Sequence, residues 1–145
     1  MSEKVNSYDE AVIKLKERQN GGIFGNCYAV CLHNSDFIIG EVFAKREGLD
    51  TYSVGWNFNL NYGGNGHATE AAKELFRYLF EKDARRIYAY AEADNISSQK
   101  VCERLGMRKE GLFLEFISFI NNPDGTPYYE NTYQYAILKK EWKNS

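Results

Sequence analysis

The feature that most constrains the fold is a glycine cluster, YGGNGHATEA, which runs from Tyr62 to Ala71 and joins a strand pattern to a helix pattern. Before it, residues 51–60 alternate apolar and polar side chains, which is the period of a half-buried β-strand. After it, residues 66–82 carry apolar side chains on one helical face, and residues 86–93 are apolar on both faces of a strand. This strand–helix–strand unit predicts two parallel strands joined by a right-handed crossover.

The other expected elements surround this unit with antiparallel strands. Ser7 and Glu10 form a capping box that predicts a first helix over residues 7–19. Further strands are predicted at 27–33, 37–45, 109–120 and 128–138, and a short helix at 96–105. The element order α-β-β-β-α-β-α-β-β predicts an α/β fold of the α+β type. Its sheet is mixed but mainly antiparallel, and helices flank it in a single domain over residues 1–145.

Charge and composition exclude several classes of protein. The net charge of −2 comes with no basic stripe, which argues against a nucleic-acid partner. No apolar run approaches the roughly 20 residues that cross a bilayer, so no membrane partner is expected. The polar, acidic start of the chain is unlike a signal peptide and indicates a cytoplasmic location. Three cysteines and two histidines offer little to a disulfide framework or to a metal site, so no metal is expected.

The position of the glycines, between a strand and a helix, indicates an anion site. The first N–H groups of a helix lack intrahelical partners, and the helix dipole there favours negative charge. A Walker loop is excluded because residues 61–71 hold no lysine, and a dinucleotide fingerprint fits poorly because Thr69 replaces its third glycine. We favour a loop that holds the pyrophosphate of coenzyme A on the backbone of residues 64–69, over a tight turn without a ligand.

Two motifs carry a family resemblance, over about residues 25 to 142. The segment YGGNGHATEA, followed by AEADNISSQKVCERLGM, resembles the Gcn5-related N-acetyltransferase (GNAT) superfamily and its branch of ribosomal-protein alanine acetyltransferases, the RimJ/RimL-like group. The resemblance implies a GNAT fold, in which a central parallel strand pair splays apart to admit the cofactor. It also implies acetyl-CoA as co-substrate and a primary amine as acceptor.

The resemblance also assigns cofactor-binding residues. The backbone at the end of the strand is expected to pair with the pantetheine amides, at Phe58, Asn59 and Leu60. The pyrophosphate is expected to lie in a cradle formed by Gly64, Asn65, Gly66, His67, Ala68 and Thr69. Asn95 is expected to contact the pantetheine arm, although a plain helix N-cap explains an asparagine there equally well.

Acetyl transfer needs a neutral amine, a stabilised oxyanion and a proton for the departing thiolate. Many family members supply that proton from a tyrosine, but Cys102 stands at the matching position. The RimL-like branch implies Ser98 instead, both as the acid and as a cofactor contact. Glu41 and Glu92 are the candidate bases, and His67 at the helix start is the less favoured one.

The family resemblance leaves the acceptor and the oligomeric state open. Family members normally begin with a strand and a helix that have no match here, which predicts a bare sheet edge or reflects a truncated gene start. We therefore expect a homodimer, with exchange of the long strands at 109–138 as one form of it. The acceptor is a protein N-terminus or a small amine. A non-catalytic acyl-CoA-binding module is the alternative function, and a nucleotide-binding domain is a more distant one.

Overall fold

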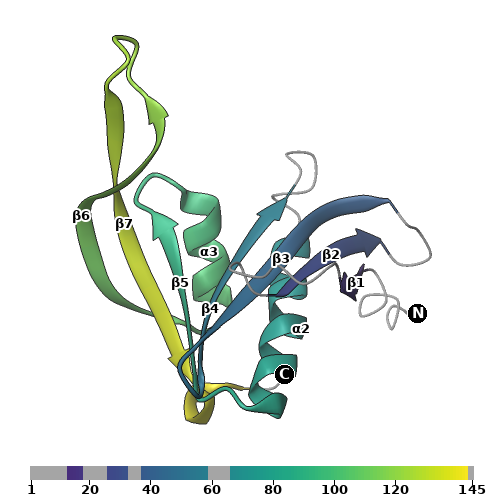
Figure 1. The fold of residues 1–145 in the computed structure, drawn as a ribbon. Coiled ribbons are helices and arrows are strands. Elements are labelled where there is room, and N and C mark those ends of the chain that lie inside the picture. The colour runs from purple at the N-terminus through teal and green to yellow at the C-terminus, as the bar shows by residue number, and fades with distance from the viewer. Residues whose placement is uncertain (1–12, 18–25, 33–36, 59–65, 144–145) are drawn as a thin grey trace.

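The computed structural model describes residues 13–17, 26–32, 37–58 and 66–143. They form one sheet of seven strands in the order β1-β2-β3-β4-β5-β7-β6 (Figure 1). The strands are β1 (Ile13–Glu17), β2 (Asn26–Leu32), β3 (Ile38–Glu47), β4 (Thr51–Phe58), β5 (Arg86–Glu92), β6 (Arg108–Asn121) and β7 (Pro127–Leu138). The helices are α2 (His67–Lys82), α3 (Ile96–Arg104) and the 3₁₀ turn η3 (Lys139–Glu141). The predicted mixed α/β architecture is confirmed.

The only parallel neighbours in this sheet are β4 and β5, which α2 connects, as the sequence predicts. All other neighbouring pairs are antiparallel. β2 and β3 form the predicted hairpin pair, although its turn at residues 34–36 lies outside the described residues.

The predicted first helix, over residues 7–19, is wrong where the structure describes it. Residues Ile13–Glu17 form β1, which pairs with β2 from Ile13 opposite Leu32 to Glu17 opposite Tyr28. The segment IKLKE alternates apolar and charged residues, and pairing with β2 favours this period of two over the helix that the capping box of Ser7 and Glu10 predicts. Among the described strands, β1 rather than β2 is therefore the outermost one at this edge of the sheet. The rest of the predicted helix lies outside the described residues.

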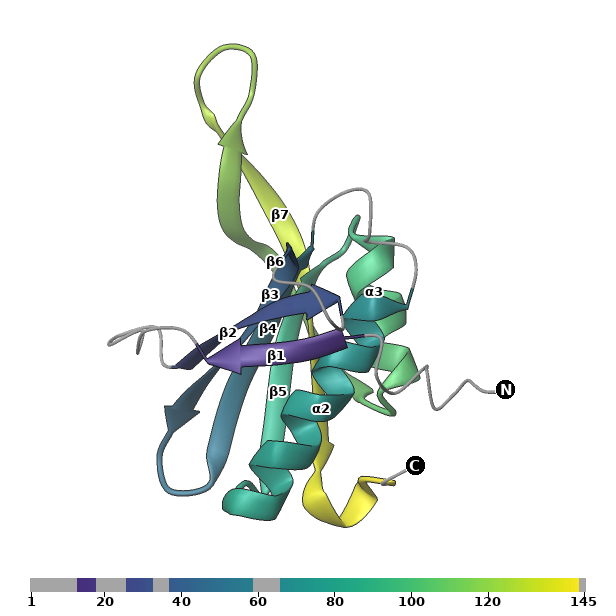
Figure 2. The same ribbon diagram turned by 90° about the vertical axis from the view of Figure 1, so that its right-hand side faces the viewer.

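One face of the sheet carries both helices and the hydrophobic core (Figure 2). The buried residues of α2 recur at helical spacing, namely Ala68, Ala71, Ala72, Leu75, Phe76, Leu79 and Phe80. They pack on inward-facing strand residues such as Val42, Val54 and Ile87. Fully burying one large apolar side chain contributes about 1.5–3 kcal/mol, so this face holds the fold together. Alternate strand residues, Glu41 and Tyr88 among them, point to the opposite face, which no described helix covers.

The long hairpin of β6 and β7 extends beyond the body of the sheet as an arm (Figure 1). Its register shifts three times, and the largest shift lies between Phe113 and Ile117. Glu115, inside that bulge, has a φ of 48°, and its N–H donates to the Asn131 side chain at 2.9 Å. Bulges bend a strand and increase its twist, which accounts for the curved path of β6.

An ion pair ties the edge strand β6 to β5 across the intervening β7. Arg86 donates two hydrogen bonds to Glu110, at 2.8 and 2.9 Å, and Gln134 of β7 donates a third at 3.2 Å. Hydrogen bonding from Arg86 is the main cause that lowers the pKa of Glu110 below its ordinary 4.5. At a pH above the pKa that Glu110 has in the unfolded chain, the ionised carboxylate therefore stabilises the fold. This contribution is lost as the pH falls through the lower pKa that Glu110 has in the folded protein.

Replacing Glu110 by glutamine tests this contribution. At pH 7 the variant should unfold at lower urea concentration than the unmodified protein, because Arg86 loses its charged partner. The difference in the free energy of unfolding should shrink as the pH falls below the ordinary carboxyl pKa of 4.5 and through the lowered pKa of the folded carboxyl, because the unmodified side chain then becomes protonated as well. Urea titrations at several pH values measure it. A difference that is constant between pH 7 and pH 3 would contradict the assignment.

Candidate functional site

The candidate site begins where the parallel strands separate. β4 and β5 are paired only from Thr51 opposite Arg86 to Val54 opposite Ala89, yet β4 continues to Phe58 and β5 to Glu92. Beyond Val54, β4 stays paired with β3 on its other side. The edge of β4 that faces the gap therefore presents backbone groups without a strand partner, which is where an extended ligand can add like a strand.

This separation confirms the splayed parallel pair. Of the three residues expected to pair with pantetheine, Phe58 ends β4 and is half-buried. Asn59 and Leu60 lie outside the described residues.

Next to the gap, α2 begins at His67 with Gly66 as its N-cap. Gly66 has a φ of 83°, the left-handed region that favours glycine, and its carbonyl accepts the first helical hydrogen bond, from Glu70, at 2.9 Å. The hydroxyl of Thr69 is buried and has no hydrogen-bond partner among the described residues. A buried hydroxyl without a partner is costly, and an oxygen-rich ligand at this helix start would satisfy it. Gly64 and Asn65 lie outside the described residues.

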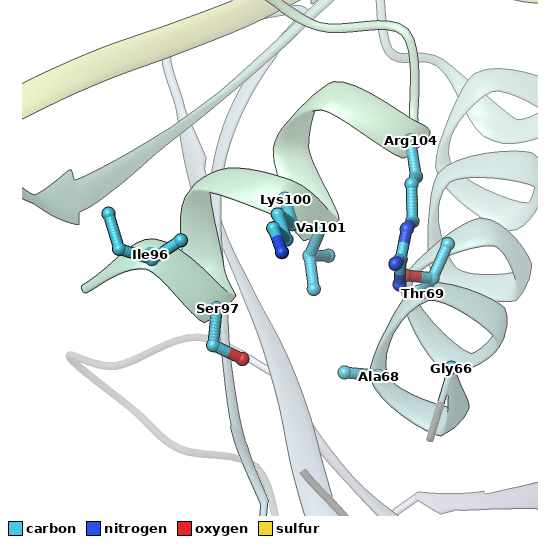
Figure 3. Close-up of a pocket in the computed structure, with 8 residues that line it drawn as sticks. All are labelled: Gly66, Ala68, Thr69, Ile96, Ser97, Lys100, Val101 and Arg104. Atoms are coloured by element: carbon cyan, nitrogen blue, oxygen red, sulfur yellow. The ribbon is translucent and has the colours of Figure 1, made fainter. Parts of the chain in front are cut away.

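A cavity of about 260 Å³ separates this helix start from α3 (Figure 3). It is lined by Gly66, Ala68, Thr69, Ile96, Ser97, Lys100, Val101 and Arg104. Three of the predicted pyrophosphate residues therefore border it. Lys100 and Arg104 were not among the predicted site residues. The signal that could have found them is their spacing, since positions 97, 100, 101 and 104 share one face of the predicted helix.

Asn95 caps α3. Its side-chain oxygen accepts a hydrogen bond from the N–H of Ser98 at 3.1 Å, so its interpretation as an N-cap is confirmed. Gln99 secures the same turn to the end of β5 by donating to the carbonyls of Glu92 and Ala93, both at 3.0 Å. Ser98 is thereby held half-buried in the first turn of α3, while its neighbour Ser97 lines the cavity.

The two candidate bases lie on opposite sides of the gap. Glu41 of β3 is in register with Asn57 of β4, whose side chain donates to it at 3.4 Å, and the Cys27 thiol donates to it at 3.3 Å. Glu92 ends β5, in register with Thr132 of β7. Strand alternation places both carboxylates on the face opposite the helices, because Val42 and Ala91 beside them belong to the core.

The side of the gap near Glu92 is acidic. The pKa of Glu130 on β7 is raised, first by desolvation and then by the negative charges of Asp94 and Glu92. Carboxylates that repel one another in this way favour a nearby cation.

Comparison with known proteins decides the family. The acetyltransferase (GNAT) domain model matches residues 2–108 of the chain. This chain belongs to the GNAT acetyltransferase family. As a GNAT protein it is 38% identical over 137 residues to the uncharacterized N-acetyltransferase YnaD of Bacillus subtilis (strain 168), in a match that covers 93% of this chain and 77% of YnaD. By enzyme class it is therefore an acetyl-CoA-dependent acetyltransferase.

Solved GNAT structures share the fold. An acetyltransferase from Bacillus anthracis is 35% identical with a TM-score of 0.69, over 79% of this chain and 67% of that one. RimL, a ribosomal L7/L12 alpha-N-protein acetyltransferase solved in complex with coenzyme A, is 19% identical with a TM-score of 0.67, over 78% and 61%. At 19% identity the likeness shows the fold alone. The chain thus spans 61–67% of the length of these two proteins.

Cys102, which stands where many GNAT proteins have a tyrosine, is part of the core. It is wholly buried, and burial is the main cause that raises the pKa of its thiol to about 12. The thiol is therefore protonated and out of reach of a ligand in the gap.

The described residues contain neither a candidate membrane-spanning helix nor a candidate metal site. No helix in this part of the GNAT chain combines the length and the apolar character needed to cross a membrane. Across residues 13–17, 26–32, 37–58 and 66–143, no three or more His, Cys, Asp or Glu side chains are grouped to hold a metal ion. That no metal takes part in the reaction stays a prediction.

Proposed function

We propose that this protein transfers the acetyl group of acetyl-CoA to a primary amine, by direct attack of the amine in a ternary complex. The observation that carries the proposal is the gap between β4 and β5, which opens next to the cavity at the start of α2. The gap suits the extended pantetheine arm, and the cavity suits the phosphates. The orphaned hydroxyl of Thr69 supports this fit.

In this proposal the backbone of β4 near Phe58 pairs with the pantetheine amides, and the helix start at Gly66–Thr69 binds the pyrophosphate. Asn95 contacts the pantetheine arm while it caps α3. Both ends of the co-substrate are then held by rigid elements, which places the thioester at a fixed position in the gap. Holding two reactants in this way supplies much of the rate, since effective molarities reach roughly 10⁵ M or more.

The chemistry needs two proton transfers. As the amine nitrogen bonds to the acetyl carbon and the carbon–sulfur bond breaks, the amine loses a proton and the thiolate gains one. We assign the acid to Ser98, which the Asn95 cap holds in place. Glu41 or Glu92 accepts the amine proton, directly or through water. These two carboxylates lie on the open face of the sheet, which an acceptor can approach without crossing the helices.

The acidic group formed by Glu92, Asp94 and Glu130 favours a cationic acceptor, either a peptide N-terminus or a small amine. A screen of acetyl-CoA against peptide N-termini, polyamines and aminoglycosides, with free thiol as the readout, tests the transfer. Thiol release that depends on an amine, with an acetylated product confirmed by mass, supports the proposal.

If coenzyme A binds but none of these amines is acetylated, the proposal of acetyl transfer is overturned. The remaining explanation is then a non-catalytic acyl-CoA-binding module. A rise in melting temperature with nucleotides, and not with coenzyme A, would instead indicate a nucleotide-binding domain. We also place the reaction in the cytoplasm, which cell fractionation tests.

A homodimer is a further part of the proposal, and the β6–β7 arm supplies its surface. Within residues 112–120 the exposed side chains are large and apolar except for Glu115. Residues 112–120 form an apolar segment of the arm with one charge, and such a segment fits a second copy of itself, because a two-fold axis brings identical surfaces together. We propose that these segments of two chains pack face to face, because that contact would cover their exposed apolar side chains.

Replacing both Leu114 and Phe119 by lysine tests the dimer. Their side chains are 70% and 64% exposed, so the change should leave the core intact. We expect the unmodified protein to have twice the mass of one chain in light scattering, and the variant to have the mass of one. Leu49→Lys is the control, because Leu49 is 84% exposed in the turn between β3 and β4. An unmodified protein with the mass of one chain would end the proposal.

A further inference from the structure

Two cations on one face of α3 point into the cavity across from the helix start of α2. Lys100 and Arg104 are one helical turn apart, and both line the cavity with Ser97 and Val101 (Figure 3). The Arg104 side chain extends toward α2 and ends beside Thr69 (Figure 3). The two side chains belong to α3 and not to the glycine turn before α2. Their positive charges therefore add to the partial positive charge of the α2 N-terminus, which borders the same cavity.

Neither cation has a carboxylate partner in the described part of the chain. The other described arginines all form ion pairs, namely Arg46 with Asp83, Arg77 with Glu74, Arg85 with Asp50, Arg86 with Glu110, and Arg108 with Glu110 and Glu141. Arg104 is the exception, although Glu103 is adjacent to it in the sequence. A cation that faces a cavity without a protein partner is available to an anionic ligand.

Coenzyme A carries two separate anionic groups. The helix start at Gly66–Thr69 suits the pyrophosphate, as proposed above. The ribose 3′-phosphate remains, and a phosphomonoester carries about −1.5 to −2 charges at pH 7. One lysine and one arginine balance that charge, and the planar guanidinium can donate two parallel hydrogen bonds to phosphate oxygens.

We propose that Lys100 and Arg104 bind the 3′-phosphate of coenzyme A and make the protein distinguish coenzyme A from dephospho-coenzyme A. This inference rests on the proposed function to the extent that coenzyme A occupies this cavity. Lys100 and Arg104 are then specificity-determining residues for the co-substrate and take no part in the proton transfers.

Calorimetric titration with coenzyme A and with dephospho-coenzyme A tests the proposal. The unmodified protein should bind coenzyme A about 100-fold more tightly, because each of the two cations donates a hydrogen bond to a charged group, which contributes about 1.5–3 kcal/mol. Lys100→Ala and Arg104→Ala should each weaken coenzyme A binding about 10-fold and change dephospho-coenzyme A binding less than about 2-fold. The double variant should bind both ligands alike.

Lys82→Ala and Arg77→Ala are matched controls. Both residues lie on α2, outside the cavity lining, and should leave both affinities unchanged. Equal losses for the two ligands in Lys100→Ala and Arg104→Ala would overturn the proposal, because the cations would then bind the pyrophosphate. Equal binding of both ligands by the unmodified protein would also overturn it.

These binding measurements do not depend on turnover. If coenzyme A binds with the expected preference but no amine is acetylated, transfer fails and the 3′-phosphate site stands. If acetyl-CoA and acetyl-dephospho-CoA support transfer with equal KM, the phosphate site fails and transfer stands. If the unmodified protein does not bind coenzyme A at all, both proposals fail.

Discussion

Replacing Ser98 by alanine should lower kcat by about 100-fold or more, with little change in the KM for acetyl-CoA. A positioned general acid contributes roughly 10²–10⁴-fold to a rate. The change removes only the hydroxyl. The N–H of residue 98, which bonds to the Asn95 cap, is retained, so α3 should still form. Thiol release with an excess of the best acceptor amine measures kcat.

Ser97→Ala is the matched control for this prediction. Ser97 is next to Ser98 and lines the cavity, so its loss should raise the KM for acetyl-CoA modestly and leave kcat unchanged. A hydroxyl that protonates the thiolate should matter less with an acyl donor whose leaving thiol is more acidic. An unchanged kcat in Ser98→Ala, or an equal loss of kcat in Ser97→Ala, would remove Ser98 as the acid.

Replacing Phe76 by alanine should lower the free energy of unfolding by about 3–5 kcal/mol, as for other buried phenylalanines. Phe76 is fully buried in the middle of α2. Its ring lies 5.6 Å from that of Trp142 and 6.4 Å from that of Phe80, so truncation leaves a cavity between the helix and the C-terminal turn. Such a loss is a large part of the 5–15 kcal/mol that stabilises a typical domain.

Tyr78→Ala is the comparison for Phe76→Ala. It removes an aromatic ring from the same helix, but Tyr78 is 48% exposed and touches Tyr28 and Lys82 near the surface. Its loss should cost about 1 kcal/mol or less. Urea unfolding of the two variants beside the unmodified protein gives both values. Equal losses would mean that Phe76 contributes no more to packing than an exposed aromatic side chain of the same helix.

The sequence predicts the central unit of this fold well because its signals are strong. Apolar and polar residues alternate over 51–60, and the apolar residues of α2 lie on one helical face. In the structure Tyr52 and Val54 of β4 are buried, as are the apolar residues of α2. The helix predicted from the capping box of Ser7 and Glu10 is wrong over Ile13–Glu17, because pairing with β2 outweighs that local signal. Partners distant in the sequence leave no local signal, so pairing of this kind is not visible in the segment itself.

The candidate site was predictable in part. The glycines predict a tight turn before a helix start, where the N–H groups favour an anion, and Gly66 adopts the left-handed backbone that such a turn requires. The splay came only from the family resemblance, since unpaired backbone groups after Val54 leave no trace in the side-chain pattern. Lys100 and Arg104 were missed because charged residues on a helix usually face solvent, and only the neighbouring helix start shows that these two face a cavity.

The short pairing between β4 and β5 has a mechanical consequence. The sheet consists of two halves, β1–β4 and β5–β7–β6, which pair with each other only at the four positions of β4 from Thr51 to Val54. Past Val54 the two halves are connected through the helices that pack on one face of the sheet. A ligand that forms backbone hydrogen bonds with β4 beyond Val54 would extend the contact between the two halves and reduce their bending relative to each other. Binding of the co-substrate would then stiffen the protein along the line where the acceptor has to be aligned.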